Sequence, residues 1–381
     1  MPTNATQLPQ HNGLAEVQRL QSLVEAKGAC SLPGCTLIYD RIVPVLQRAV
    51  IRGFVSLPHA QHTFRSLRFG YTGGAQQALL ERSGQRPFRN YPSAIAARAA
   101  VTRSLNARIA AGKSLLIGKA SNSLYSSFSS RYASWFMFSL GAVPKAMEPN
   151  EMRPVSDHSK SGLNACCDLT HLKHTYDTYN DIAMHLLKGY FMHVSDVKDA
   201  FPTLPLAPWL WPFYMCRFFI NDDDTVLWVI MHLFADFGGA GWPGEFHLFF
   251  SKVIVGMARS ELVLTLEMPI YVDDMGLLGE FNSQVRREMR RFQLWAMALG
   301  LLFKWLKDRV AARTQLMIGF WWDSKRRIRT LEERRFGQYM EMLLDFASRR
   351  SLTLVERQRG IGRMTRAIMT LPPGAKCLMG E

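Results

Sequence analysis

The sequence predicts an α+β fold in which helices and antiparallel hairpins are mixed. Strand and helix patterns do not alternate regularly along the chain, which disfavours a parallel βαβ arrangement. Two apolar runs, residues 213–220 and 225–233, flank Asn-Asp-Asp-Asp at 221–224, a pattern typical of a hairpin. A second strand–turn–strand is predicted for PIYVDDMGLLGE at 269–280. The 381 residues are 48% hydrophobic and 11% aromatic, which is enough for a globular core.

The first part of the chain is expected to contain short amphipathic pieces, one longer helix and a loop. Residues 1–80 indicate an N-terminal extension, partly disordered, with short amphipathic pieces at 17–25 and 41–51. A helix is predicted over 93–111, because alanine is frequent there and a glycine follows as a stop. The serine-rich stretch at 121–130 predicts a loop.

The elements expected further along are a strand at 136–143, a helix at 172–187, a strand at 190–195, a helix at 252–264, a helix at 283–299, a strand at 316–322 and a last helix beginning at 353–356. Gly300 is expected to close the helix at 283–299, because glycine adopts the left-handed conformation that ends helices. Thr353 and Glu356 have the spacing of a capping box, which places the start of the last helix.

The charge of the chain is strongly basic and unevenly distributed. The formal net charge is +15 and the isoelectric point is about 9.8. No Asp or Glu occurs between Arg82 and Met147, and a second basic zone extends from Arg286 to Arg366. Two basic zones on either side of an acid-containing middle suggest a polyanion held next to a metal-binding site. The alternative is that these cations are solvated helical faces.

Cysteine content and hydropathy exclude several other classes of protein. Six cysteines in a chain of this length do not form a disulfide scaffold, and the pairs Cys30–Cys35 and Cys166–Cys167 lack the spacing of a zinc site. No stretch reaches the ~18 consecutive apolar residues of a membrane helix, and the start lacks the layout of a signal peptide. We therefore expect an intracellular protein of the nucleus or cytoplasm, neither secreted nor in a membrane.

Two adjacent carboxylates, Asp273 and Asp274, interrupt the apolar segment at 269–280. Two negative charges in a half-buried element cost free energy unless a cation meets them. Both could instead form a surface turn, but no Asn-Gly or Pro marks a simple turn here. Asp196, at the end of the strand predicted for 190–195, can supply a third carboxylate. Such a set suits two divalent cations ~3.5–4 Å apart and therefore phosphoryl transfer.

Several segments around these acids resemble the sequence motifs of reverse transcriptases. IYVDDMGLL resembles motif C, SDVKDAFPTLPL resembles motif A, and FGGAGWPGEF at 237–246 has the spacing of motif B. VPK at 143–145 and MRPVSD at 152–157 are similar to the fingers segment, and LGLL at 299–302 and IGF at 318–320 to motifs D and E. Weaker similarity on both sides is to DIRS-type and related LTR-like retrotransposon polymerases.

The resemblance implies a right-hand polymerase with fingers, a palm built on an antiparallel sheet, and a short helical thumb. Residues 81–189 would form a basic fingers-side region, 190–325 the palm with the motifs, and 326–381 helices of a thumb or connection. Beyond Arg335 there is room for a short thumb, and no ribonuclease H carboxylate set, protease or integrase is visible in the sequence.

The resemblance also implies roles for five residues at the reacting centre. Asp196, Asp273 and Asp274 would be the metal-binding and catalytic carboxylates. The backbone carbonyl of Val197 would be an extra metal ligand. Lys307 would neutralise or protonate the departing pyrophosphate, with a solvated lysine as the alternative. The metal would be Mg²⁺, with Mn²⁺ as a second choice.

Four further residues are implied to bind the incoming nucleotide. Lys145 and Arg153 would hold its triphosphate, although either could be an ordinary surface base. Phe201 would be the gate against a ribose 2′-OH, with plain core packing as the alternative. Gly238 would let the backbone approach the template–nucleotide pair closely.

Motif B and the fingers segment depart from the usual pattern of the family. Gly239-Ala240-Gly241-Trp242 stands where Lys, Arg or Asn followed by Ser or Ala is more usual, and Trp242 is bulky for a position near the template. Glu148 and Glu151 lie between the two predicted triphosphate contacts.

The function that these motifs predict is RNA-directed DNA polymerisation. Deoxynucleoside triphosphates would be added to a DNA primer on an RNA template by two-metal nucleotidyl transfer. The alternative is a retroelement-derived protein that binds nucleic acid without polymerising. An RNA-dependent RNA polymerase is disfavoured, because Phe201 is not small and Val272, not glycine, precedes the Asp pair.

Overall fold

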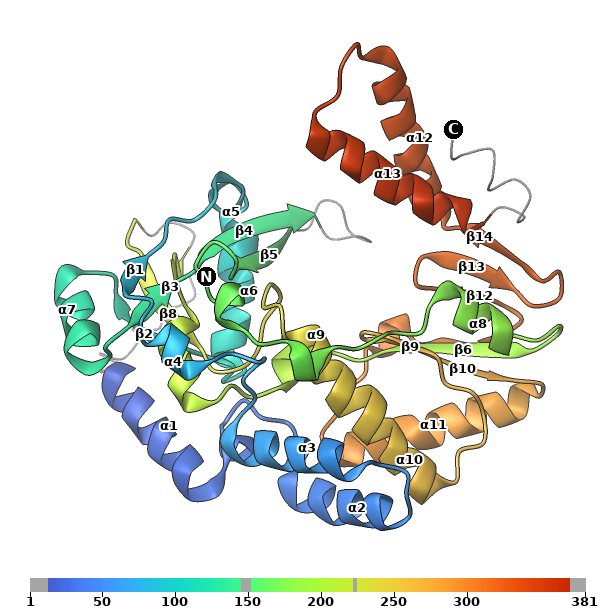
Figure 1. Ribbon diagram of the computed structural model, residues 1–381, viewed down its shortest axis with the longest axis horizontal. Helices are drawn as coiled ribbons and strands as arrows, with labels where there is room; N and C mark the ends of the chain where they lie inside the picture. Colours follow the sequence, from blue (N-terminus) through green and yellow to red (C-terminus); the bar gives the residue numbers. More distant parts are fainter. Residues whose placement is uncertain (1–12, 145–151, 222–224, 371–381) are drawn as a thin grey trace, which may run out of the picture. The chain divides into compact units, whose positions relative to one another are not determined.

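The computed structural model describes residues 13–144, 152–221 and 225–370, and Figure 1 shows its helices and strands. These residues form two compact units. The first unit draws on Met1–His174, Asp199–Glu261 and Ala298–Leu301, and the second on Thr175–Lys198, Leu262–Met297 and Leu302–Glu381. The four domains expected from the sequence (1–80, 81–189, 190–325 and 326–381) stay a prediction, because each of the two units combines pieces of several of these segments.

The first unit is rich in helices that bury one face each. They are α1 (Gly13–Lys27), η1 (Ala29–Ser31), α2 (Tyr39–Ile51), α3 (Leu57–Phe69), α4 (Gln77–Leu80), α5 (Pro92–Ala96), α6 (Arg98–Ala110), α7 (Asn122–Arg131), η2 (Asn164–Cys166), η3 (Thr170–Leu172), η4 (Phe201–Thr203), η5 (Pro208–Phe213), α9 (Trp242–Phe246), the π-helix η6 (His247–Ile254) and α10 (Val255–Leu262). In α2 the buried residues Ile42, Leu46 and Ala49 recur every three or four positions, which is the spacing of one helix face. The amphipathic pieces predicted at 17–25 and 41–51 are confirmed as parts of α1 and α2.

A five-stranded sheet of order β1-β3-β7-β8-β2 forms the core of the first unit. Its strands are β1 (Gln85–Pro87), β2 (Ser114–Lys119), β3 (Trp135–Met137), β7 (Met215–Phe218) and β8 (Trp228–His232). Strands β7 and β8 are antiparallel, so the hairpin predicted around 221–224 is confirmed, although 222–224 lie outside the described residues. Phe218 and Ile230 pack in one cluster with Val101 and Leu105 of α6, which fixes that helix on the sheet.

Strands β4 (Ser139–Pro144) and β5 (Met152–Asp157) form a separate antiparallel pair in the first unit. Their register extends from the Ser139–Asp157 pair to the Pro144–Met152 pair. The pair therefore fixes the position of Arg153 opposite Val143, while Lys145 lies outside the described residues.

The second unit is built on an antiparallel sheet of order β11-β6-β10-β9. Its strands are β6 (Phe191–Asp196), β9 (Ile270–Tyr271), β10 (Asp274–Gly279) and β11 (Arg309–Ala312), and it also contains α8 (Tyr179–His185), α11 (Asn282–Ala298) and η7 (Trp305–Lys307). Met192 and Val194 of β6 and Leu278 of β10 pack against Ile182 of α8 and Leu186 at its end. The strands predicted at 190–195 and 269–280 are confirmed.

A small sheet and a helical hairpin complete the second unit (Figure 1). They are β12 (Thr314–Met317), β13 (Phe320–Asp323), β14 (Ile328–Leu331), α12 (Glu333–Ser348) and α13 (Leu354–Ile368). The predicted capping box is present at the start of α13, where Thr353 and Glu356 satisfy each other's backbone N–H groups. The predicted end of α11 is also confirmed, because Gly300 has φ +98° just beyond it.

Two of the predicted elements are wrong. Residues 121–130 form the helix α7 and not a loop, because Ser121 caps the helix and Phe128, fully buried, packs on Trp135. Residues 316–322 form a hairpin and not a single strand. The chain turns at Ile318 and Gly319, whose φ values of +47° and +79° do not fit a strand.

Three other predicted elements are shorter or divided. The helix predicted at 172–187 begins only at Tyr179, because Thr178 and Asp181 form a capping box there. The helix predicted at 93–111 is interrupted at Ala97. The strand predicted at 136–143 is two strands, because β3 pairs in the five-stranded sheet and β4 pairs with β5.

The mixture of helices and mainly antiparallel strands confirms the predicted α+β class. Within the described ranges, no helix combines the length and the apolar character that crossing a membrane requires.

Candidate active site

Three carboxylates meet at the ends of β6 and β10, the two central strands of the antiparallel sheet of the second unit. Asp196 ends β6, Asp274 begins β10, and the two residues are direct partners in the β6–β10 register. The backbone N–H of Val197 donates to the carbonyl of Asp273 over 2.9 Å, which holds the third acid beside the first. The structure therefore brings together the three aspartates that the sequence predicts. The role of the Val197 carbonyl as a ligand stays a prediction.

The turn that carries Asp273 is strained. Tyr271 and Asp274 are partners across the β9–β10 hairpin, which leaves Val272 and Asp273 as its two turn residues. Val272 has φ +56°, a conformation that favours glycine and is unusual for a β-branched residue. Backbone strain of this kind is found most often at functional sites.

The carboxylates destabilise one another in their charged forms. Burial, followed by the charges of Asp273 and Asp196, raises the pKa of Asp274 from its ordinary 3.8 to about 7. Burial and the charge of Asp196 also raise the pKa of Asp273. A divalent cation would relieve this repulsion, and carboxylate oxygens at a strand edge are the ligands that Mg²⁺ prefers. The donor set therefore fits the predicted metal.

Two lysines lie against these carboxylates. Lys304 Nζ is 2.5 Å from Asp196 Oδ1 and 3.5 Å from Asp273 Oδ2. Lys307 Nζ is 3.2 Å from Asp196 Oδ2. As the side chains stand, no group of three acidic, imidazole or thiol side chains among the described residues is arranged to hold one ion. Lys307, predicted from the resemblance, lies beside Asp196, and its role towards pyrophosphate stays a prediction. Lys304 was not predicted from the sequence.

A buried polar network supports the segment that carries both lysines. Gln293 of α11 donates to Ser195 over 2.9 Å and to Asp308 over 2.7 Å, and His193 Nε2 lies 3.1 Å from Asp308. Burial opposes ionisation of Asp308, but the hydrogen bond and charge of His193, together with hydrogen bonds of Gln293 and Ser195, lower its pKa. The network connects β6 and α11 to Asp308, which directly follows Lys307.

The nucleotide-binding candidates in the first unit gather around Phe237. Phe201 is only 6% exposed and its ring lies 5.0 Å from that of Phe237, which is 39% exposed. The guanidinium of Arg153 lies over the same Phe237 ring, 5.5 Å from its centre. Arg153 and Phe201 are thus brought together, and Phe237 is the exposed ring of the group. The sequence analysis noted Phe237 as part of motif B but gave it no role.

Gly238 is required by close packing. Its φ is +124°, and a Cβ there would lie 1.9 Å from the carbonyl oxygen of Ser156. The Asn164 side chain also holds this loop. It accepts a hydrogen bond from the Ala240 N–H over 2.9 Å and donates one to the Gly238 carbonyl over 3.0 Å. The loop that follows Phe237 is therefore fixed on the end of β5.

A buried ion pair lies directly behind this loop. His158 Nε2 is 2.8 Å from Asp236 Oδ1, and the two side chains are 0% and 7% exposed. Burial alone would raise the pKa of Asp236, but the charge and hydrogen bond of His158 lower it to about 2. Because Asp236 precedes Phe237 and His158 follows β5, the pair joins the two segments that carry the nucleotide-binding candidates.

Three residues that the sequence left ambiguous have structural partners. Trp242 is fully buried and contacts Gly239, so its bulk fills the core below motif B. Asp157 accepts a hydrogen bond from Tyr91 over 2.5 Å, as a structural acid would. Asp199 lies 3.9 Å from Lys113, a residue distant in the sequence.

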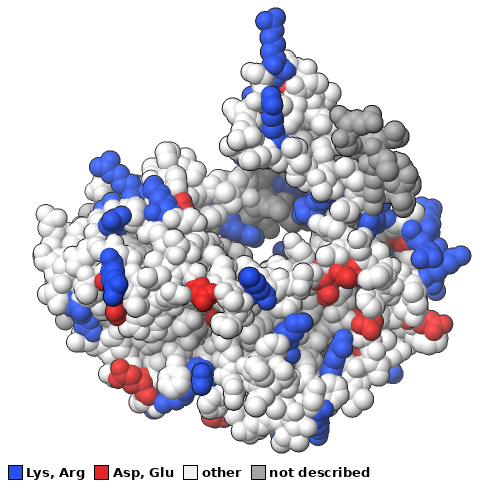
Figure 2. All heavy atoms as spheres, viewed as in Figure 1, with Lys and Arg blue, Asp and Glu red and all other residues white. Residues whose placement is uncertain are grey.

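Part of the basic character is structural. Arg108 donates to the carbonyl of Phe234 over 3.2 Å, and burial lowers its pKa. Arg98 stacks on Phe219 at 3.7 Å. Other cations are exposed, and Figure 2 shows a basic cluster over the turn between β13 and β14, where Lys325, Arg326 and Arg327 are all exposed. The two expectations about the basic zones, a bound polyanion and solvated helical faces, stay predictions.

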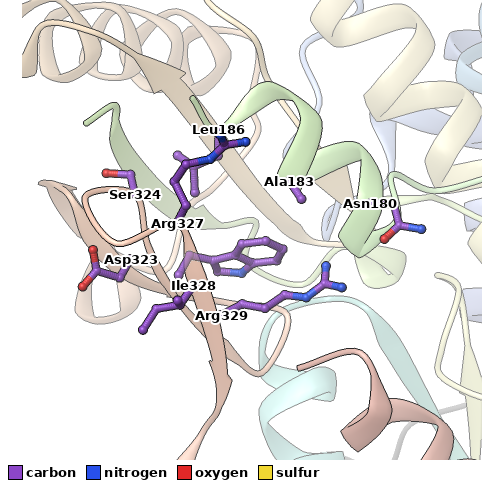
Figure 3. A pocket seen from close by; sticks show the side chains of 9 residues that line it. Asn180, Ala183, Leu186, Asp323, Ser324, Arg327, Ile328 and Arg329 are labelled. Atoms are coloured by element: carbon purple, nitrogen blue, oxygen red, sulfur yellow. The ribbon is translucent and has the colours of Figure 1, made fainter. Parts of the chain in front are cut away.

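A pocket of about 220 Å³ lies between α8 and the β13–β14 hairpin (Figure 3). Arg329 lines it, together with Leu186 and Ile328. The Arg329 guanidinium donates to the carbonyls of Met369 and Tyr179, so it anchors the end of α13. This pocket shares no residue with the carboxylate cluster.

No protein-family model and no curated protein sequence matches the chain. Solved structures do. A foamy viral protease–reverse transcriptase, in the form named dRH and in complex with double-stranded DNA, matches with a TM-score of 0.52 and 15% identity over 74% of this chain and 42% of that chain. The chain has a reverse-transcriptase-like fold.

Two further structures of foamy viral protease–reverse transcriptase agree with this. The complex with double-stranded DNA has a TM-score of 0.50 and 14% identity, covering 75% of this chain and 50% of that chain. The complex with an RNA/DNA hybrid has a TM-score of 0.52 and 14% identity, covering 74% and 32%. The chain spans about a third to a half of the length of these proteins. At this identity the likeness shows the fold, and the polymerase-like fold predicted from the motifs is confirmed.

Proposed function

We propose that the chain is an RNA-directed DNA polymerase that extends a DNA primer on an RNA template. The observation that carries this proposal is the pairing of Asp196 with Asp274 across β6 and β10, with Asp273 beside them. Burial and neighbouring negative charge raise the pKa of Asp273 and of Asp274, and with Asp196 these two acids offer a set of carboxylates that divalent cations would complete. The reverse-transcriptase-like fold and the order of the motifs support the same function.

In the proposed reaction the primer 3′ oxygen attacks the α-phosphorus of a deoxynucleoside triphosphate, and pyrophosphate leaves. Bound Mg²⁺, or Mn²⁺, would activate the attacking oxygen and offset the charge of the leaving group. Asp196, Asp273 and Asp274 hold these ions in the proposal. Lys307, whose ammonium already lies at this edge, is a cation available to neutralise pyrophosphate.

Selection of the nucleotide is proposed for the group around Phe237. Arg153 offers a planar guanidinium for phosphate oxygens, and Lys145 is proposed as its partner. Phe201 lies behind Phe237, so the two rings together would form the wall against a ribose 2′-OH. Gly238 keeps the adjoining backbone close to β5.

The origin that we propose is a retroelement, of the DIRS-type or a related LTR-like group. The similar structures are complexes with double-stranded DNA and with an RNA/DNA hybrid. An RNA template and a DNA primer or product are accordingly the proposed partners of this chain.

Primer extension tests the proposal. Wild type, Asp273→Asn and Asp199→Asn are compared on an RNA template with deoxynucleotides and Mg²⁺. Asp273→Asn should lower extension by about 10²-fold or more, since it removes charge at the reacting centre. Asp199→Asn is the matched control, because the Asp199 side chain is 47% exposed and its nearest ion-pair partner is 3.9 Å away. Equal loss in both variants would contradict the assigned site.

A second candidate function is binding of nucleic acid without polymerisation. The contact of Lys304 and Lys307 with Asp196 favours it, since these ammonium groups neutralise the acid without a metal. It predicts that wild type and Asp273→Asn bind primer–template equally, with steep salt dependence, and that neither extends it.

The gate assignment has its own test. Phe201→Ala should raise incorporation of ribonucleotides relative to deoxynucleotides by about 10-fold or more, the range expected when a shape contact is removed. Phe246→Ala removes a ring that also packs on Phe201, 6.1 Å away, and serves as the control for simple loss of packing. If both variants change selectivity equally, Phe201 is only a core residue.

A further inference from the structure

Lys304 is held beside the carboxylates by its backbone. Its N–H donates to the carbonyl of Asp196 over 2.9 Å, and the N–H of Lys198 donates to Leu302 over 2.8 Å. Between these bonds, Val197 and Phe303 form an antiparallel bridge. Residues 302–304 therefore continue the sheet alongside the end of β6. Strand register therefore places the backbone of Lys304 beside Asp196, and the flexible side chain reaches the acids from there.

The side chain of Lys304 contacts two of the three acids. Its ammonium lies between Asp196 Oδ1 at 2.5 Å and Asp273 Oδ2 at 3.5 Å. The side chain is 32% exposed, so solvent provides a path along which the ammonium can leave. A divalent ion bound by Asp196 and Asp273 would use the same oxygens. One cation must therefore give way to the other.

We propose that Lys304 is a built-in counter-cation that occupies the metal-binding carboxylates until a divalent ion displaces it. The inference rests on the proposed function and names how its metal site is regulated. While the metal is absent, the ammonium limits the repulsion between Asp196 and Asp273. When the metal binds, the ammonium swings towards solvent. Lys304 thereby sets the concentration of divalent ion that the site requires.

Lys307 provides an internal comparison of the same charge. It contacts Asp196 alone, at 3.2 Å, and its side chain is 53% exposed. It belongs to the short turn η7, where its N–H donates to the carbonyl of Lys304 over 2.8 Å. Removing either lysine removes one positive charge near Asp196, but only Lys304 bridges two acids. A difference in metal affinity between the two variants therefore measures displacement of the Lys304 ammonium by the metal. The general effect of losing one positive charge is the same in both.

The experiment is a titration of the full chain with Mn²⁺, followed by electron paramagnetic resonance of the free ion. Wild type, Lys304→Met, Lys307→Met and Lys304→Arg are compared, with Asp273→Asn marking the site. We expect Lys304→Met to bind Mn²⁺ about 3- to 10-fold more tightly than wild type, because no ammonium competes. Lys307→Met should change affinity by less than about 2-fold, and Lys304→Arg should restore the affinity of wild type.

A thermal melt of the same variants gives a second readout that does not depend on activity. Without metal, Lys304→Met should melt below wild type, and saturating Mn²⁺ should raise its melting temperature more than that of wild type. Equal or weaker Mn²⁺ binding by Lys304→Met, or equal effects of the two methionine variants, would overturn the inference alone. Binding that is absent, or unaffected by Asp273→Asn, would instead overturn the proposed metal site and the inference with it.

Discussion

Asp236 in the first unit is buried and Asp274 in the second is half-buried, and their surroundings shift their pKa values in opposite directions. Asp236 has His158 at 2.8 Å, and despite its burial its pKa falls to about 2. Asp274 has Asp273 and Asp196 as neighbours, and burial with their charges raises its pKa to about 7. The first acid is neutralised within the protein, whereas the second is not.

The difference separates a structural acid from a functional one. A buried charge with a close, hydrogen-bonded partner fixes the elements around it, as Asp236 and His158 fix the motif B loop on β5. A group of like charges with incomplete neutralisation lowers stability and persists where something external completes it. We propose that the carboxylates at the ends of β6 and β10 are of the second kind.

The largest expected effect is the loss of the buried pair. Asp236→Ala should lower the free energy of unfolding by about 3–5 kcal/mol, because it leaves the His158 imidazole buried without its counter-charge. Urea denaturation at neutral pH measures the change. Asp199→Ala, in the same unit and exposed, should cost less than about 1 kcal/mol. Similar losses in the two variants would remove the distinction drawn for Asp236.

A smaller effect is expected at Glu245, a buried acid whose histidine partner, His62, is partly exposed. Glu245 is 1% exposed and accepts from the N–H of Gly73 at 3.2 Å, with His62 Nε2 at 2.6 Å. His62→Ala should cost about 1–3 kcal/mol, since one partner of a buried acceptor is lost.

His62→Gln is the matched control for that variant. It retains a donor and should recover part of the loss in the same denaturation experiment. The Gly73 contact remains in both variants. A cost for His62→Ala as large as that for Asp236→Ala would show that burial alone, and not the number of partners, decides the effect.

How far the sequence predicts this site depends on what each residue's role requires. Asp196, Asp273, Asp274 and Lys307 were predicted because motif order and spacing are properties of the sequence. Lys304 was not, because its place opposite Asp196 comes from the pairing of residues 302–304 with the end of β6. Pairing between distant segments leaves no local pattern in a chain.

The same limit applies to the first unit. Phe201 was predicted as an aromatic wall, but its burial behind Phe237 depends on the fold of two motifs against each other. The pair of His158 and Asp236 joins residues far apart in the sequence, and neither belongs to a motif that marks a partner.

Local elements were predicted best where capping and turn residues decide them. The capping box at Thr353 was predicted. The one at Thr178 was not, so the helix that begins at Tyr179 was predicted to begin at 172. The Ser121–Ser130 stretch was misjudged because a single buried aromatic, Phe128, holds a polar sequence in a helix. Burial of that ring is again a tertiary property.

The smallest expected effect has the opposite sign and concerns Asp274. Since its pKa is raised from 3.8 to about 7, the folded chain binds this proton more tightly than the unfolded chain. Stability from this group is fully present below about pH 4 and is lost as the pH rises to about 7. Asp274→Asn should remove that loss and raise the free energy of unfolding by about 1 kcal/mol at pH 8. The gain is small because solvent at the open ends of the strands screens the repulsion.

Thermal melts of wild type and Asp274→Asn between pH 4 and pH 8 measure this difference. The wild-type melting temperature should fall relative to the variant across that range, and Mg²⁺ should reverse the fall by neutralising the cluster. Asp236 should behave in the reverse way, with its stability lost only as the pH falls from about 4 towards 2. A wild-type chain that follows the variant at every pH would mean that Lys304 and Lys307 already neutralise all three acids, and the contrast between the two regions would disappear.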